Sequence, residues 1–278
     1  MAETFAKPQP VIDGSAYTSR MGANSPILSV RAIEKVFGTR DSVTHALAGV
    51  SFDVESGEFV AIMGPSGSGK TTLLNCVSTI DKVTSGNIIV DGRDITGYSK
   101  RQLAKFRRED LGFVFQDSNL LDTLTGFENI ALALTIQHAK SAEIPGRVEQ
   151  VAKKLGVEDV MKKYPYQMSG GQKQRVAAAR AIVGHPKLVL ADEPTGALDS
   201  RNAAVMLEML EMLNKTLNST IMMVTHDAFA ASFATRVLFI KDGALFTELR
   251  RGDAPREEFF TRIMEVVTFL GGDASHAS

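Results

Sequence analysis

The sequence predicts an α/β fold built on a mostly parallel β-sheet. Three observations support this prediction. A complete phosphate-loop pattern stands between an apolar, β-prone run and a helical run. Other apolar runs end in polar or acidic residues, as strands of a parallel sheet do where their carboxyl ends form a site. A long stretch of helical periodicity interrupts the strands, which indicates an inserted helical subdomain.

The phosphate loop, residues 64–71, fills every fixed position of the pattern G-x-x-x-x-G-K-[ST]. Glycines let the backbone curl so that successive N–H groups point at phosphate oxygens, and the positive end of the next helix faces the same anion. Lys70 supplies a cation for the β- and γ-phosphates, and Thr71 a hydroxyl for Mg²⁺. A chance Gly/Ser-rich turn is disfavoured by the strand before it and the helix after it. The residues expected to bind a nucleoside triphosphate are Gly64, Pro65, Ser66, Gly67, Ser68, Gly69, Lys70, Thr71 and Thr72.

Composition limits the alternatives. The 278 residues are 44% hydrophobic and 23% charged, which is typical of a globular protein, and the formal net charge is −1. That charge gives no whole-protein attraction for nucleic acid, so no nucleic-acid partner is expected. Cys76 is the only cysteine, which excludes an intramolecular disulfide and suits a reducing cytoplasm. No apolar run approaches the ~18 residues of a membrane span, and residues 1–26 lack the apolar segment of a signal peptide.

The N-terminal part is expected to contain a disordered extension and then several strands. Residues 1–26 are rich in Ala, Ser, Pro and Gly and have no periodicity. Strands are predicted at 27–30, 50–54 and 59–63. Between the first two, Phe37 precedes a polar loop at 39–44. Its ring could stack on a nucleotide base or plug the end of a strand, and spacing alone favours neither.

The middle of the chain is expected to contain two strands and then helices. A short strand at 86–92 ends in an Asp-Gly turn, and another at 111–115 ends at Gln116. A polar side chain in that position, such as Gln116, can contact Mg²⁺ or the attacking water. Residues 126–156 carry apolar side chains at helical spacing, and we assign the helical subdomain to about 100–175.

A second glycine-rich helix start consists of Ser169, Gly170, Gly171 and Gln172, which precede an Ala-rich helical run at 176–183. Its exposed N–H groups make a second anion site by the same physics as the first. Ser-Gly-Gly also caps many helices, and for an isolated motif that explanation would be preferred. The chain has two helix starts of this kind, about a hundred residues apart, and this favours a phosphate-binding role for the second one as well. One triphosphate need not contact both within a single chain.

An apolar strand at 188–191 runs into the paired carboxylates Asp192 and Glu193. Asp192 suits the acid that holds Mg²⁺ through water, and Glu193 suits the base that orients and polarises the attacking water. Paired acids after a strand can also cap a helix. The phosphate loop already requires a Mg²⁺ ligand, however, and this favours the catalytic interpretation.

The C-terminal third is expected to hold a helix at 200–217 and the last core strand at 220–224. That strand brings His226 to the same edge as Glu193 and Gln116. A lone histidine is more often structural than catalytic, but this position favours catalysis. Residues 255–270 place apolar side chains on roughly one helical face. A helix packed back onto the domain is the preferred interpretation, and a partner-binding helix is the alternative.

In this order and spacing, GPSGSGKT, Gln116, SGGQ, LVLADE, ALD and His226 resemble the ATP-binding subunits of ABC transporters over residues 27 to about 249. The resemblance implies a RecA-like P-loop NTPase core with an N-terminal antiparallel β subdomain, and the division 27–250 and 251–278 for the ATPase domain and the C-terminal helix and tail. It implies that Phe37 stacks on adenine, where tyrosine is usual, and that Asp199 is the D-loop acid. Residues 169–172 would be the signature motif, which reaches the γ-phosphate of ATP on a second copy in a head-to-tail dimer. Met168 replaces the usual leucine before it.

A narrower resemblance links residues 115–125, 224–227 with 230–232, 239–243 and the tail 259–272 to the bacitracin-resistance (Bce-type) branch of the macrolide-exporter-like ABC group. It implies transport-coupled ATP hydrolysis with ATP and Mg²⁺ at the cytoplasmic face of the plasma membrane. The implied partners are a separate FtsX-like permease, docked at residues 117–127 around Leu120 and Leu121, and a sensor histidine kinase reached through the permease.

Two other functions compete with this one. Lipoprotein-release and cell-division ATPases belong to the same group, and the tail and residues 117–125 argue against them. Soluble ABC ATPases of translation or DNA repair carry two cassettes or a coiled-coil insertion with a Cys-x-x-Cys hook. This sequence has neither.

Overall fold

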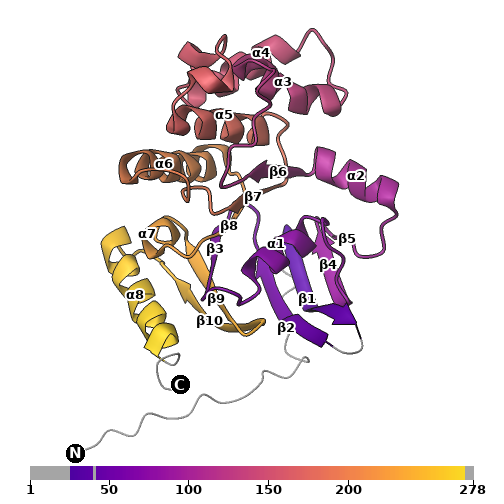
Figure 1. Cartoon of the computed structure of the whole chain (residues 1–278), viewed down its shortest axis with the longest axis vertical. Helices are drawn as coiled ribbons and strands as arrows, with labels where there is room; N and C mark the ends of the chain where they lie inside the picture. Colours follow the sequence, from indigo (N-terminus) through magenta and orange to yellow (C-terminus); the bar gives the residue numbers. More distant parts are fainter. Residues whose placement is uncertain (1–25, 40–41, 273–278) are drawn as a thin grey trace, which may run out of the picture.

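The computed structural model describes residues 26–39 and 42–272. The extension predicted to be disordered, residues 1–26, therefore lies outside the described residues except for Pro26. Two β-sheets lie next to each other, and helices α3, α4 and α5 stack at the far end of the molecule (Figure 1). The predicted α/β fold with a mostly parallel sheet is confirmed.

The core is a six-stranded sheet in the order β10-β9-β3-β8-β7-β6. All neighbours pair in parallel except β9 and β10, which are antiparallel. Every residue of β3 and β8 is buried, because a parallel sheet covered on both faces needs continuous apolar strands. The strands are β3 (Phe59–Met63), β6 (Leu111–Val114), β7 (Leu188–Asp192), β8 (Ile221–Val224), β9 (Arg236–Lys241) and β10 (Ala244–Arg250).

The prediction that the strand at 220–224 is the last of the core is wrong. β9 follows it and pairs in parallel with β3, from Val60 opposite Arg236 to Met63 opposite Phe239. β9 is buried up to Ile240, so its apolar run is a core strand by the same criterion as β3. The strand that leads into the phosphate loop is therefore held between two parallel neighbours.

The second sheet is antiparallel, in the order β2-β1-β4-β5, and confirms the predicted N-terminal β subdomain. Its strands are β1 (Leu28–Thr39), β2 (Ser42–Val54), β4 (Ser85–Val90) and β5 (Arg93–Asp94). β1 and β2 are longer than predicted, so most of the expected loop at 39–44 is strand, and residues 40 and 41 lie outside the described residues. Helix α1 (Lys70–Val77) shares one apolar cluster with strands of both sheets, which fixes the phosphate loop between them.

The remaining helices cover the core sheet or form the helical layer. They are α2 (Lys100–Glu109), α3 (Gly126–Ile136), α4 (Ile144–Lys154), α5 (Gly170–Ile182), α6 (Ser200–Leu217), α7 (Ala228–Ala231) and α8 (Arg256–Gly272), with short 3₁₀ turns at Glu158–Val160 and Pro165–Gln167. β6 belongs to the core sheet although it falls within the predicted helical range 100–175. Helix α8 buries Phe259, Ile263 and Leu270 against the core, as expected of a helix packed back onto the domain.

Candidate active site

The phosphate loop adopts a backbone that only glycine tolerates at two of its positions. Gly64 and Gly69 have φ of 152° and 102°. An added Cβ would lie 2.0 Å from the Ile240 carbonyl oxygen at the first position and 2.3 Å from the Ala46 carbonyl oxygen at the second. Helix α1 then begins at Lys70 without a side-chain cap. Its first N–H groups are therefore left for a ligand, as in other anion-binding helix starts.

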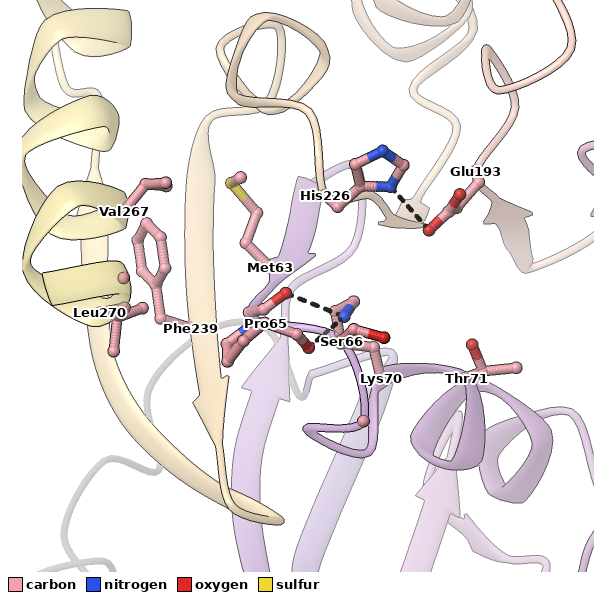
Figure 2. A pocket seen from close by; sticks show the side chains of 13 residues that line it. Met63, Pro65, Ser66, Lys70, Thr71, Glu193, His226, Phe239, Val267 and Leu270 are labelled. Carbon is pink, nitrogen blue, oxygen red and sulfur yellow. Dashed lines mark hydrogen bonds and ion pairs between the residues drawn. The ribbon is translucent and has the colours of Figure 1, made fainter. Parts of the chain in front are cut away.

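Lys70 is folded over the loop that it belongs to. Its Nζ donates to the carbonyl oxygens of Gly64 (2.9 Å) and Pro65 (2.8 Å) (Figure 2). Burial lowers the pKa of Lys70, and the nearby charges of Glu193 and Asp192 oppose that shift. The Ser68 Oγ is buried and has no hydrogen-bond partner among the described residues. A buried cation and an unpaired hydroxyl beside free N–H groups make a cradle suited to phosphate.

The acidic edge of the site lies where β7 ends. Burial is the main reason that the pKa of Asp192 is raised; the charge of Glu193 adds to the rise and that of Lys70 opposes it. Glu193 has φ of 44°, a conformation that costs a non-glycine residue on the order of 1 kcal/mol and that clusters at functional sites. Its N–H donates to the Val224 carbonyl oxygen at 2.9 Å, which holds the bend to β8. The Glu193 carboxylate then meets His226, with 2.9 Å between Oε1 and Nδ1 (Figure 2).

One cavity of about 610 Å³ joins the phosphate loop to this acidic edge. Of the predicted site residues it is lined by Gly64, Pro65, Ser66, Gly67, Lys70, Thr71, Glu193 and His226. Gln116 is exposed two residues beyond β6 and lies near Gly196, where an added Cβ would be 3.0 Å from its amide. It therefore stands beside the segment that follows Glu193, outside the cavity lining.

Phe37 lies in β1 opposite Thr44, apart from the cavity lining. Its side chain is 42% exposed, and the Lys35 Nζ lies 4.7 Å from the ring centroid. This exposure favours a stacking surface for a base over a buried plug.

The second helix start is capped by its own residues. Ser169 Oγ accepts from the Gln172 N–H at 3.2 Å, and Gln172 Oε1 accepts from the Ser169 N–H at 3.0 Å. Ser169 and Gly170 are exposed, whereas an added Cβ on Gly171 would lie 2.2 Å from the Asn202 side chain. None of these four residues lines the cavity at the phosphate loop.

Asp199 caps α6 in a similar way. Its Oδ1 accepts from the Asn202 backbone N–H at 2.9 Å and its Oδ2 from the Asn202 side-chain amide at 2.7 Å. These hydrogen bonds lower the pKa of the Asp199 carboxyl.

Sequence reasoning missed three side chains that hold the segment after β6. Gln174 on α5 donates to the carbonyl oxygens of Phe115 and Gln116, and Arg180 donates to those of Asn119 (2.7 Å) and Ser118 (2.9 Å). Asn129 on α3 is fully buried and donates to the Leu121, Leu124 and Thr125 carbonyl oxygens. The sequence signal that could have identified them is a polar residue on the otherwise apolar face of a predicted helix, because such a buried side chain needs a hydrogen-bond partner.

Neither a cluster of metal ligands nor a membrane-spanning helix is found among the described residues. The described part of the chain has no group of three or more His, Cys, Asp or Glu side chains that could hold a metal ion alone. Within those same residues, no helix combines the length and the apolar character needed to cross a membrane.

Comparison with known proteins agrees with this geometry. A family model described as ABC transporter matches residues 47–196. The bacitracin export ATP-binding protein BceA of Halalkalibacterium halodurans is 50% identical over 246 residues, which cover 88% of this chain and 97% of that protein. The ABC transporter ATP-binding protein YxdL of Bacillus subtilis is 48% identical over 91% of this chain and 97% of its own length.

Among solved structures, a dimeric post-hydrolysis state of the cassette MJ0796 bound to ADP and Pi superposes with a TM-score of 0.73. It is 37% identical and covers 80% of this chain and 98% of its own. MJ0796 is a protein of Methanocaldococcus jannaschii. The predicted family and the predicted ATPase activity are confirmed. The chain belongs to the ABC transporter family, as a subunit that binds and hydrolyses ATP.

Proposed function

We propose that this ATPase powers a transporter that protects a bacterium from cell-wall-directed peptide antibiotics. The observation that supports ATP hydrolysis is the single cavity in which the phosphate loop meets the Glu193–His226 pair. The peptide-antibiotic assignment is supported by a relative named for bacitracin export that is half identical over almost its whole length.

The geometry supports a division of labour in hydrolysis. Glu193 accepts the proton of the attacking water, and His226, 2.9 Å from its carboxylate, holds that side chain in place. Lys70 leaves the Gly64 and Pro65 carbonyl oxygens and turns to the β- and γ-phosphates. Phe37 stacks on adenine with its exposed face.

Oxygen donors at the phosphate loop and at the end of β7 fit Mg²⁺, and Gln116, outside the cavity lining, offers a further one. Thr71 is exposed at the start of α1 and offers a hydroxyl, and Asp192 and Gln116 offer carboxylate and amide oxygens. An all-oxygen set with few carboxylates suits an ion that keeps several waters and binds substrate phosphates. Burial, and after it the charge of Glu193, raises the pKa of Asp192, and a bound cation would favour the ionised form of this carboxyl. When bound, Mg²⁺ would neutralise charge on the phosphates.

A second copy of the chain completes the site. Residues 169–172 form a self-capped helix start, with Ser169 and Gly170 exposed, and none of the four lines the cavity of its own chain. In a head-to-tail dimer, Ser169, Gly170, Gly171 and Gln172 would face the γ-phosphate on the other copy, with Asp199 beside them. The dimeric state of the similar cassette MJ0796 supports this arrangement.

The membrane partner is an FtsX-like permease, which would hold the subunit at the cytoplasmic face of the plasma membrane and connect it to a sensor histidine kinase. Its docking surface lies in residues 117–127, whose backbone is fixed from within by Asn129 and Arg180. Leu121 is 47% exposed, whereas Leu120 packs against the core, so Leu121 is the better contact.

Leu121→Asp should weaken co-purification of the permease, since an apolar contact of this kind contributes roughly 1–2 kcal/mol. Ile80→Asp, at an apolar side chain that is 59% exposed elsewhere, is the control. Equal co-purification of the two variants would remove Leu121 from the docking surface.

The test of the proposed function is deletion of the gene and measurement of sensitivity to bacitracin-like and lanthionine peptides. Sensitivity should rise, and the wild-type gene should restore resistance while Glu193→Gln should not. Unchanged sensitivity together with a defect in lipoprotein sorting or cell division would assign the subunit to those transporters instead.

A further inference from the structure

The cavity at the phosphate loop has two chemically different ends. Its polar end is made by the loop, Lys70, Glu193 and His226. Its other end is lined by four apolar side chains, namely Met63, Phe239, Val267 and Leu270. Figure 2 shows Val267 and Leu270 directed from α8 toward Phe239, on the side of Pro65 away from Thr71.

The apolar end is formed by two core strands and the last turn of α8. Met63 and Phe239 are opposite each other in the paired strands β3 and β9, and both are buried. Helix α8 is anchored through Phe259 and Ile263, which are fully buried, and through the Arg256 guanidinium, 4.3 Å from the centroid of the Phe233 ring. Its last turn then reaches the cavity with Val267, Leu270 and Gly271. The position of that turn is thus set by the core.

The apolar end offers no polar partners for the triphosphate of the substrate. Phosphate oxygens need N–H groups or cations, and these are provided around Lys70 and the start of α1. The apolar side chains offer neither. Met63, Phe239 and Leu270 are buried within the chain, whereas Val267 is half-buried and Gly271 is exposed, so the open part of this end lies at the last turn of α8.

We propose that a second copy of this chain covers the apolar end, so that the last turn of α8 forms part of the dimer interface. This inference rests on the head-to-tail dimer of the proposed function. Val267 and Leu270 line the same open cavity as the phosphate loop, so the end of α8 is continuous with the face at which the second copy would dock. A copy that closes over the loop therefore also closes over the end of α8. The helix lies outside residues 47–196, which the family model matches, so the contact extends the interface beyond that segment.

Gly271 is a position where a reporter cysteine can be introduced without a steric clash. Gly271 lines the cavity, and a Cβ added there would meet no atom within 4 Å. The native Cys76 is 2% exposed, and burial raises its pKa to about 11, so it reacts poorly with thiol reagents. Gly97 is the matched control, because it is exposed in the β subdomain and an added Cβ there also meets nothing within 4 Å.

The experiment compares maleimide labelling of Gly271→Cys and Gly97→Cys, both in the Glu193→Gln background, with and without ATP. ATP should slow labelling of the Gly271→Cys thiol by roughly tenfold or more, because a buried thiol reacts only when the interface opens. Labelling of Gly97→Cys should not change. Protection should increase with protein concentration, which distinguishes cover by a second copy from cover by bound nucleotide.

Size-exclusion chromatography of the same samples separates the possible failures. A dimer that forms while labelling of Gly271→Cys stays unchanged would overturn the α8 contact and leave the dimer of the proposed function standing. No dimer with ATP would overturn both. Protection that is independent of protein concentration would also overturn the contact.

Discussion

The two helix starts that follow Ser- and Gly-containing turns differ in how their N–H groups are satisfied. Helix α1 starts at a left-handed Gly69 with no side-chain cap, beside a buried and unpaired Ser68 hydroxyl. Helix α5 starts at Ser169 with a complete capping box. Similar residues therefore give one helix start that needs a ligand and one that needs none. In the proposed function, the first helix start binds ATP and the second is presented to another copy.

The largest expected difference between the two helix starts is in ATP affinity when a glycine of each is replaced by alanine. Gly69→Ala places a Cβ 2.3 Å from the Ala46 carbonyl oxygen in a backbone that alanine rarely adopts, so ATP binding should fall by at least about a hundredfold. Gly170→Ala meets only Leu198, at 3.7 Å, and should bind ATP normally. Titration with a fluorescent ATP analogue measures both. Equal affinities would show that the conformation at Gly69 is not required.

Glu193→Gln should lower ATP turnover by about 10² or more, because it keeps the size of the side chain and removes the base. ATP should still bind at the α1 start, and an ATP-bound dimer should accumulate. Steady-state phosphate release and size-exclusion chromatography report the two effects. Near-normal turnover would show that another group is the base.

Substitutions at Ser169 distinguish capping from action on a second copy. Ser169→Ala removes the α5 cap, which should cost about 1 kcal/mol of folding free energy, and should reduce turnover. Ser169→Asn restores a cap but has no hydroxyl, so it should restore Tm without restoring turnover. If asparagine restores both, the serine acts only as a cap.

The smallest expected effect concerns the acidic edge beside α1. Because the folded protein raises the pKa of Asp192, ionisation of this carboxyl opposes folding above its folded pKa and has no effect below its unfolded pKa. Without nucleotide, Asp192→Asn should therefore raise Tm at neutral pH, by about 1–2 °C, and the gain should vanish as the pH falls toward the unfolded pKa. Thermal unfolding at several pH values tests this. A gain in Tm that grows as the pH falls would show that ionisation of Asp192 stabilises the folded protein instead.

Local chemistry explains what could be predicted from sequence. The phosphate loop, the Asp192–Glu193 strand end and the helix at 200–217 each depend on neighbouring residues, and each is found where it was expected. The meeting of Glu193 with His226 followed from a rule about parallel sheets, since both residues come just after adjacent strands, β7 and β8.

Long-range packing explains what could not be predicted. The apolar run of β9 resembles several others, and only its pairing with β3 makes it a core strand. Asn129 and Gln174 appear as ordinary helix residues until the carbonyl groups after β6 are placed beside them. The contribution of α8 to the cavity likewise depends on an approach between segments about two hundred residues apart.

If the two helix starts act on one ATP from different copies, two variants that each lose one of the starts should complement each other in a mixed dimer. Lys70→Ala disables the α1 site and leaves α5 intact, whereas Ser169→Ala does the reverse. A mixed dimer retains one complete site, so the mixture should hydrolyse ATP faster than the sum of the separate variants. Activity no greater than that sum, in a mixture shown by chromatography to contain mixed dimers, would show that the two helix starts do not act on one ATP from different copies.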